Sequence, residues 1–241
     1  MGCRNRQPTI DYIMSYTVAK CREALIAYKP VGVLSEHSED ENNIVSLVCK
    51  ELSALGEPTE LYTVHRLDRA VSGLLVLART KSAAQKLSRL VSEEGFGKEY
   101  LALVEGEPKE KEGELFDYLK KDKLRSMAVS ALSSDATAKE ARLSYRVIAT
   151  AEGKKGRVSL LSVTLDTGRF HQIRAQMSLR GMPLVGDSKY GSTDRFARTP
   201  SLFCHRLEVE INGTRFVGSA LPPLDKYPWV LFAEELAALA D

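Results

Sequence analysis

Short apolar runs and stretches of helical spacing alternate along the first part of the chain. Ala24–Tyr28 and Leu74–Ala78 are wholly or almost wholly apolar and lie next to turn residues, which predicts two buried strands. Between them, apolar residues recur every three or four positions, which predicts a helix: Ile44, Leu47, Val48, Leu52 and Leu55. The polar segments that flank this helix, residues 36–41 and 63–69, are expected to be loops.

The middle of the chain carries weaker signals. A second helix is expected to end at Gly95, and a strand is expected at Tyr100–Val104. Residues 107–136 are charged and then small and polar. We expect turns there, with a short strand near Leu115 and a flexible loop at about residues 130–137.

Clearer patterns return towards the C-terminus. Ala141–Ala149 and Val158–Leu165 read as strands, and His171–Leu179 has helical spacing. Apolar residues alternate on both sides of Asn212-Gly213, which predicts a hairpin over residues 207–217 because this dipeptide favours a two-residue turn.

The order of these elements defines the fold class. Hairpins are mixed with helices, and the regular βαβ repeat of a doubly wound sheet is missing. We therefore expect an α+β fold built on an antiparallel or mixed sheet. We expect residues 1–23 to be a polar N-terminal segment and residues 24–241 to form one domain.

Composition excludes some classes of protein. The chain has 241 residues, 44% of them hydrophobic and 27% charged, as in a soluble globular protein. No apolar run approaches the ~18 residues of a membrane span, and no signal peptide is recognised. The cysteines lack metal-binding spacing and are expected to be buried, reduced thiols of a cytoplasmic protein: Cys3, Cys21, Cys49 and Cys204.

Charge is distributed unevenly along the chain. Residues 139–215 carry fourteen Lys or Arg and seven Asp or Glu, a net charge of +7, whereas residues 36–60 carry a net charge of −6. A basic surface suits a polyanionic partner, although an ordinary solvated face has the same composition.

One carboxylate lies in an unusual context. Asp68 is preceded by Arg66, followed by Arg69, and lies just before the apolar run at Leu74–Ala78. Neighbouring positive charge keeps a carboxylate ionised, and an ionised carboxylate can be a nucleophile, a base or an electrostatic stabiliser. A structural ion pair or a turn-capping aspartate would explain the same residues, so this stretch alone leaves both interpretations open.

Two other stretches combine cations with groups that suit RNA. At the predicted junction of strand and helix, Arg169 and Arg174 could contact phosphate or pair with a buried carboxylate, and a basic solvent face is the alternative. Lys98 and Tyr100 should share one face of a strand, where the ring could stack on a base, unless the tyrosine belongs to the core. The remaining histidines, His37 and His205, form no catalytic set, and nucleotide-binding glycine motifs are absent.

Together these stretches resemble the RluA-type family of RNA pseudouridine synthases. The resemblance extends from about Ala24 to Pro222. It rests on motifs in the expected order: Ala27-Tyr28-Lys29-Pro30-x-Gly32, His65-Arg66-Leu67-Asp68-x-x-x-Ser72-Gly73-Leu74, Lys98-Glu99-Tyr100-Leu101-Ala102-x-Val104-x-Gly106, Gly168-Arg169-x-His171-Gln172-Ile173-Arg174, and Gly181-x-Pro183-Leu184-x-Gly186-Asp187-x-x-Tyr190-Gly191.

The resemblance implies a mixed, largely antiparallel sheet around a central cleft, and the isomerisation of uridine to pseudouridine in ribosomal or transfer RNA without a metal or organic cofactor. It implies that Asp68 is the catalytic aspartate and that Arg174 pairs with it. It also implies that Tyr100 stacks against the target base and that Arg66 enters the space left by a flipped nucleotide. We expect a cytoplasmic monomer that selects its RNA through the catalytic body and the loops at residues 107–137 and 186–201.

The chain departs from the family pattern at a few positions. Val71 stands where threonine is frequent, Gln176 stands where histidine is common, and the predicted hairpin lacks the usual His-Pro pair. Two other functions compete with the leading hypothesis. A non-catalytic RNA-binding protein would explain the basic segment, whereas a glycoside hydrolase would need a second carboxylate that the motifs do not supply.

Overall fold

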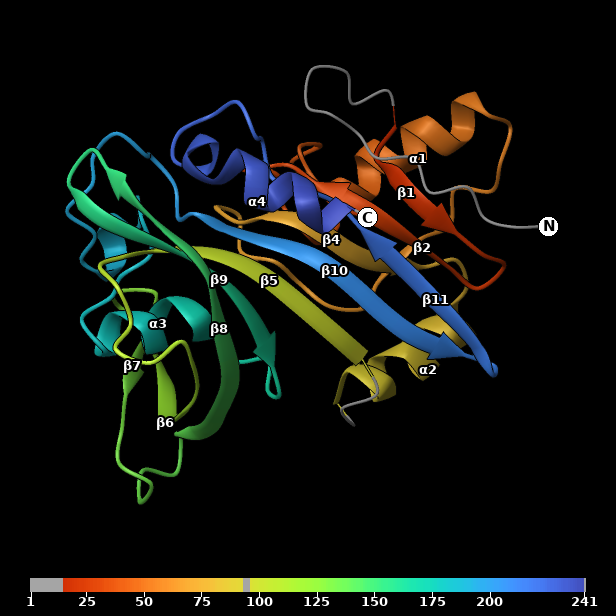
Figure 1. Cartoon of the computed structure of the whole chain (residues 1–241). Helices are drawn as coiled ribbons and strands as arrows, with labels where there is room; N and C mark the ends of the chain where they lie inside the picture. The colour runs from red at the N-terminus through yellow and green to blue at the C-terminus, as the bar shows by residue number, and fades with distance from the viewer. Residues whose placement is uncertain (1–14, 93–95, 241) are drawn as a thin grey trace. The chain divides into compact units, whose positions relative to one another are not determined.

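The computed structural model of the protein describes residues 15–92 and 96–240. The chain forms two compact units, shown in Figure 1. The first unit comprises Met1–Lys98, Phe203–Pro223 and Ala240–Asp241, and the second comprises Glu99–Leu202 and Leu224–Leu239. The boundary at Lys98 falls inside strand β5 (Phe96–Glu105).

The first unit is built on a mixed sheet. Strands β1 (Thr17–Lys20), β2 (Ala24–Lys29) and β4 (Ser72–Ala78) pair antiparallel in that order, and β4 pairs in parallel with β10 (Leu202–Ile211). Strand β11 (Thr214–Ser219) pairs antiparallel with β10, and the short β3 (Tyr62–Thr63) pairs with the end of β4. Every residue of β2 and β4 is buried, as their apolar runs predicted.

Helix α1 (Ile44–Ala54) supplies four of the nine side chains in one buried apolar cluster of this unit. Its N-terminus is capped by Asn43, whose side chain accepts a hydrogen bond from the Ser46 amide at 2.8 Å. One face of the helix packs on β2 and β4 in a cluster of buried side chains: Leu25, Ala27, Val33, Ile44, Val45, Val48, Leu52, Leu75 and Leu77. Helix α2 (Lys81–Ser92) contacts β4 and β3, and its predicted end at Gly95 lies outside the described residues.

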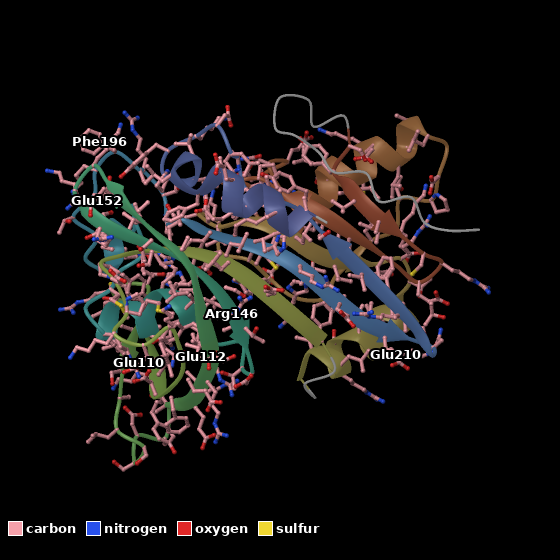
Figure 2. The ribbon with its side chains drawn as sticks, viewed as in Figure 1. Glu110, Glu112, Arg146, Glu152, Phe196 and Glu210 are labelled. Carbon is pink, nitrogen blue, oxygen red and sulfur yellow. The ribbon has the colours of Figure 1, made fainter. Side chains whose placement is uncertain are left out.

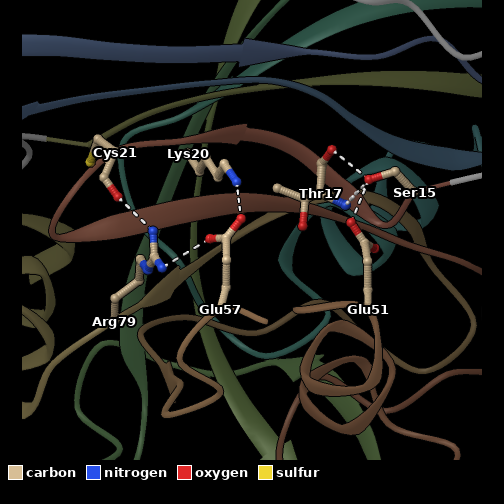
Figure 3. Close-up of polar contacts among 7 residues, drawn as sticks. All are labelled: Ser15, Thr17, Lys20, Cys21, Glu51, Glu57 and Arg79. Carbon is tan, nitrogen blue, oxygen red and sulfur yellow. Dashed lines mark hydrogen bonds and ion pairs between the residues drawn. The ribbon is translucent and has the colours of Figure 1, made fainter. Parts of the chain in front are cut away.

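Strand β1 lies within the segment that was expected to be polar and irregular. The Tyr28 amide donates to the Tyr16 carbonyl, and Glu51 of α1 accepts hydrogen bonds from the Ser15 hydroxyl at 2.5 Å and from the Tyr16 amide at 2.6 Å. Glu57 pairs with Lys20 and, at 3.2 Å, with Arg79 (Figure 3). Polar contacts to residues distant in sequence therefore hold this strand at the sheet edge, and its own apolar pattern could not reveal them.

The second unit is built on an antiparallel sheet. Its strands follow the order β5, β9 (Gly156–Leu165), β8 (Lys139–Gly153), β6 (Glu112–Asp122) and β7 (Met127–Ser130). The expected strand near Leu115 is present, but the expectation that it is short and surrounded by turns was wrong, because β6 and β7 form a hairpin. Only one face of this hairpin is covered, so charged residues occupy many of the hairpin's positions. These charged residues obscured the apolar alternation that would have indicated two strands.

Helix α3 (Gln172–Leu179) covers one face of this sheet. It contacts β6 and β7, and Ala175 packs in a buried cluster with Tyr190 and with side chains from the strands: Leu119, Ala128 and Ala141. Strand register places Tyr100, Val163 and Tyr145 in line, so Tyr100 shares the face that α3 covers. Arg146 and Glu112 occupy paired positions on the other face (Figure 2).

Short helices complete the second unit: η1 (Ser188–Tyr190), η2 (Trp229–Phe232), α4 (Ala233–Ala237) and η3 (Ala238–Ala240), of which the last residue is assigned to the first unit. The predicted hairpin over residues 207–217 is confirmed in the first unit, with Asn212 and Gly213 both at positive φ. The expected α+β class with a mixed, largely antiparallel sheet is also confirmed. The division into residues 1–23 and 24–241 remains a prediction, since residues 1–14 lie outside the described part of the chain.

Candidate active site

The Asp68 loop connects β3 to β4 in the first unit and is held by several hydrogen bonds. The Val71 amide donates to the Asp68 carbonyl at 3.0 Å and closes a turn. The Gly32 amide donates to the Arg69 carbonyl at 2.8 Å, and Arg69 Nε donates to the Gly32 carbonyl at 2.9 Å. Two hydrogen bonds between Gly32 and Arg69 therefore join the turn after β2 to the loop before β4.

Ser35 fixes the residue immediately before Asp68. Its buried hydroxyl donates to the Leu67 carbonyl at 2.7 Å and accepts from the Leu67 amide at 3.0 Å. Both backbone groups of Leu67 are thus satisfied by one side chain, in a place where an unpaired buried group would cost ~1–3 kcal/mol. The Asp68 backbone consequently has little freedom on its N-terminal side. Sequence reasoning assigned no role to Ser35.

Lys29 places a buried cation near the Asp68 carboxylate. Its side chain is fully buried, and Nζ donates to the carbonyls of Pro30 at 3.0 Å and Val33 at 2.9 Å. Burial lowers the pKa of the Lys29 ammonium to about 8, the negative charge of Asp68 raises it, and Arg69 lowers it further. The ammonium is therefore protonated at neutral pH and favours the ionised form of Asp68.

The start of β4 is shaped by two close contacts. His65 Nε2 accepts a hydrogen bond from the Val76 amide at 3.0 Å, and burial lowers the pKa of His65 to about 3, so the ring is neutral. Gly73 has φ +119°, and a Cβ there would lie 2.4 Å from the Cys204 amide nitrogen. Only glycine allows β10 to approach the strand that follows the Asp68 loop.

Arg66 and Arg69 have exposed side chains that meet carboxylates of the 36–41 loop. Arg66 pairs with Glu36 at 3.1 Å, and Arg69 lies 3.9 Å from Asp40. The flanking cations that the sequence associated with Asp68 are thus engaged by acidic groups that sequence reasoning treated only as a solvated loop.

Arg174 lies on α3 in the second unit and forms a buried, bidentate ion pair with Asp187. Arg174 Nε and Nη2 donate to the two carboxylate oxygens at 2.7 and 2.9 Å. The expectation that Arg174 pairs with a buried carboxylate or contacts phosphate is met by Asp187, which sequence reasoning quoted in a motif without a role. A guanidinium carries five N–H donors, so this pair is compatible with a second carboxylate, and pairing with Asp68 remains a prediction.

The N-terminus of α3 is surrounded by rings and cations. His171 precedes the helix in a left-handed conformation, stacks on Phe170 at 3.8 Å and lies 3.0 Å from the Tyr190 hydroxyl through Nδ1. Burial and the neighbouring Arg174 lower the pKa of His171 to about 3, so it adds no charge near neutral pH. The Tyr190 hydroxyl accepts from the Ala128 amide at 2.6 Å and ties η1 to the β6–β7 hairpin.

Two positions that depart from the family pattern are buried, one in each unit. Val71 is buried and uses only its backbone amide in the turn with Asp68. Gln176 is also buried, and its amide donates to Asp117 at 2.8 Å and to the Ala141 carbonyl at 3.2 Å. Tyr100 is almost completely buried in β5.

The structure brings Asp68 and Arg66 together in one loop of the first unit, and Tyr100 and Arg174 on one side of the sheet in the second. Cys204 is buried, whereas Cys21 and Cys49 are half-buried, so the expectation of buried thiols holds only in part, and Cys3 lies outside the described residues. Across residues 15–92 and 96–240, no helix could cross a membrane, and no three acidic, histidine or cysteine side chains are grouped to hold a metal ion.

Comparison with known proteins identifies relatives along most of the chain. A family model described as RNA pseudouridylate synthase matches residues 23–179. An uncharacterised RNA pseudouridine synthase of Haemophilus influenzae is 29% identical over 78% of each chain. The ribosomal large subunit pseudouridine synthase C of Rickettsia conorii is 30% identical over 73% of this chain and 56% of its own. An uncharacterised RNA pseudouridine synthase of Bacillus subtilis is 28% identical over 77% of this chain and 60% of its own, so the chain spans under two thirds of some curated relatives.

Solved structures agree on the fold. Human RNA Pseudouridylate Synthase Domain Containing 1 has a TM-score of 0.73 and 23% identity, covering 86% of this chain and 83% of its own. Human RNA Pseudouridylate Synthase Domain Containing 4 has a TM-score of 0.71 and 19% identity, covering 92% of both. Since the family model matches more than half of the residues, the chain belongs to the RNA pseudouridylate synthase family, of the RluA type that its motifs predicted.

Proposed function

We propose that the protein isomerises specific uridines to pseudouridine in structured ribosomal or transfer RNA, with Asp68 as the catalytic group. The main support is the setting of Asp68. It occupies the matching motif of a family member, in a loop fixed by Ser35 and Gly32 and close to the buried Lys29 ammonium. An ionised carboxylate carried on a fixed segment of backbone suits a nucleophile or a base.

The reaction moves one bond without a net change in composition. The bond between C1′ and uracil N1 breaks, the base turns, and a bond forms between C1′ and C5. C5 then loses its proton, and N1 gains one. Asp68 would either attack as a nucleophile or assist the departure of the base as a glycal-type intermediate forms. In the glycal route, Asp68 and Tyr100 are both candidates to remove the C2′ proton.

Access to the uridine requires that it leave its stack, at a cost of a few kcal/mol. We assign Arg66 to the space left by the flipped nucleotide, which would offset part of that cost. Tyr100 would face the extruded uracil, and Arg174 would keep Asp68 ionised and oriented. The exposed guanidinium of Arg66 and its weak surface pair with Glu36 support this assignment, because such a side chain can exchange partners easily.

RNA selection would rest on the catalytic body, on residues 107–137 with the β6–β7 hairpin, and on the loop at residues 186–201. The names of the Rickettsia relatives point to the large ribosomal subunit and so support a ribosomal RNA. We further propose a cytoplasmic monomer that works without a metal or organic cofactor.

The test is a map of pseudouridine in total RNA from cells with the gene, without it, and complemented with Asp68→Asn. The amide keeps the shape of the side chain but removes its negative charge. We expect at least one uridine site to lose modification without the gene and to remain unmodified with Asp68→Asn, while the purified variant retains its affinity for RNA. Asp225→Asn, at an exposed position, is the matched control and should restore the site.

Two results would contradict the proposal. Full modification by Asp68→Asn would exclude Asp68 as the catalytic group. An unchanged uridine map in cells that lack the gene would favour a non-catalytic RNA-binding protein.

A further inference from the structure

The two ends of the 36–41 loop are joined by backbone pairing, and Ser35, just before the loop, is hydrogen-bonded to the Asp68 loop. Leu34 and Asn43 form a bridge at the base of the 36–41 loop, with the Leu34 amide donating to the Asn42 carbonyl at 3.1 Å. Within the loop, Ser38 Oγ and Asn43 Nδ2 donate to the Asp40 carbonyl, and the Asn42 amide donates to Asp40 Oδ1. The acidic side chains are therefore presented from a defined backbone.

The loop makes two kinds of contact with the Asp68 loop. The first is made next to the loop by Ser35, which pairs with the Leu67 backbone in buried hydrogen bonds, while Thr63 Oγ1 of β3 donates to the Ser35 carbonyl at 3.2 Å in a half-buried one. The second is exposed, where Glu36 meets Arg66 with more than half of each side chain open to solvent. The backbones are thus held together, while the ion pair at the rim remains free to exchange.

The exposed ion pair between Arg66 and Glu36 contributes too little to the stability of the fold for stability to be its main role. Exposed ion pairs contribute ~0–1 kcal/mol and are screened by salt. A phosphate that approached Arg66 would compete directly with the Glu36 carboxylate and, after displacing it, would still lie near a like charge. Such a contact is therefore penalised for any RNA that binds through its backbone alone.

We propose that Glu36 is a specificity-determining residue that competes with RNA phosphate for Arg66, so that only RNA held by additional contacts gains access to the Asp68 loop. This inference rests on the proposed function, since it concerns the same RNA-binding surface. Asp40 contributes in the same direction at Arg69, but its Oδ1 also stabilises the loop. Glu36 is consequently the cleaner residue to test.

The experiment measures binding of oligouridylate to the 241-residue chain and to its Glu36→Gln variant, at about 0.05 M and about 0.5 M salt. The substitution keeps the size of the side chain and removes its charge. We expect affinity at low salt to rise roughly three- to tenfold, equivalent to ~0.6–1.4 kcal/mol, and the difference to vanish at high salt. The thermal unfolding midpoint should not change.

Glu39→Gln is the matched control, because Glu39 is an exposed carboxylate of the same loop and carries the same charge. It should leave affinity nearly unchanged. An equal increase in affinity in the two variants would show that the effect comes from net charge alone. No increase in Glu36→Gln would exclude competition at Arg66. Either result overturns the inference. Binding is read without turnover, so a failure of the proposed isomerase activity would be recognised separately in the uridine map.

Discussion

Two buried cations illustrate how neighbouring groups decide the behaviour of a charged residue. Arg174 is paired with the Asp187 carboxylate. The Lys29 ammonium instead donates hydrogen bonds to two backbone carbonyls, and the negative charge of Asp68 also stabilises it. A neutral acceptor balances a buried charge less well than a carboxylate does. Lys29 is therefore the cation whose protonation should respond to pH in an accessible range.

The stability of the protein should rise between about pH 8 and pH 10.5 because of Lys29. Its pKa is lowered to about 8 in the folded state, from 10.5 in the unfolded chain. Between these values the unfolded state binds more protons, so the free energy of unfolding increases with pH, by ~2 kcal/mol from pH 7 to about pH 10. Denaturant unfolding of the wild type and of Lys29→Met measures this contribution as the difference between the two proteins. A difference that stayed constant with pH would show that Lys29 does not titrate in this window.

At the scale of elements, the sequence predicted the strands that have a continuous or alternating apolar pattern. Strands β2 and β4 were recognised from their apolar runs, and the β10–β11 hairpin from alternation around Asn212-Gly213. The β6–β7 hairpin was missed, because only one of its faces is covered by α3 and polar residues fill the other. Strand β1 was missed for a related reason, as contacts to Glu51 and Glu57 hold it in place.

The candidate site shows the same limit. Asp68, Arg66, Tyr100 and Arg174 were singled out because they lie in recognisable local motifs. Ser35 and Leu67 are joined over a separation of 32 residues, and Arg174 and Asp187 over 13, so no local pattern reveals these partners. Local motifs therefore singled out the candidate groups, whereas the residues that hold these groups in place emerged only from tertiary contacts.

The approach of β10 to β4 depends on Gly73, and Gly73→Ala should be strongly destabilising. The new Cβ would meet the Cys204 backbone, and the residue would retain a φ that side chains disfavour. Strain and overpacking each contribute ~1–3 kcal/mol, so we expect a loss of ~2–6 kcal/mol in urea unfolding. Gly97→Ala is the control, since its Cβ would have an ordinary contact of 3.4 Å to Glu208. Equal effects of the two substitutions would contradict this account of β4.

At the scale of the whole molecule, charge is divided between segments with opposite signs. The acidic residues 36–60 belong to the first unit, and most of the basic residues 139–215 belong to the second. The tip of the β6–β7 hairpin adds further cations to the second unit, at Lys121, Lys123 and Arg125. General attraction to RNA should therefore come mainly from the basic segment at residues 139–215 and from the hairpin tip, while the acidic loop limits it at Arg66.

The salt dependence of RNA binding tests this division. Lys123 is exposed near the hairpin tip, and a phosphate contact there would release about one counterion on binding. Lys123→Gln should therefore weaken binding of single-stranded RNA at low salt and reduce the slope of log K against log salt by about 0.7. Lys50→Gln removes the same charge from the acidic segment, where Lys50 pairs with Glu41, and should leave the slope unchanged. If both substitutions reduced the slope equally, attraction would depend on net charge alone, and the hairpin would have no special part in it.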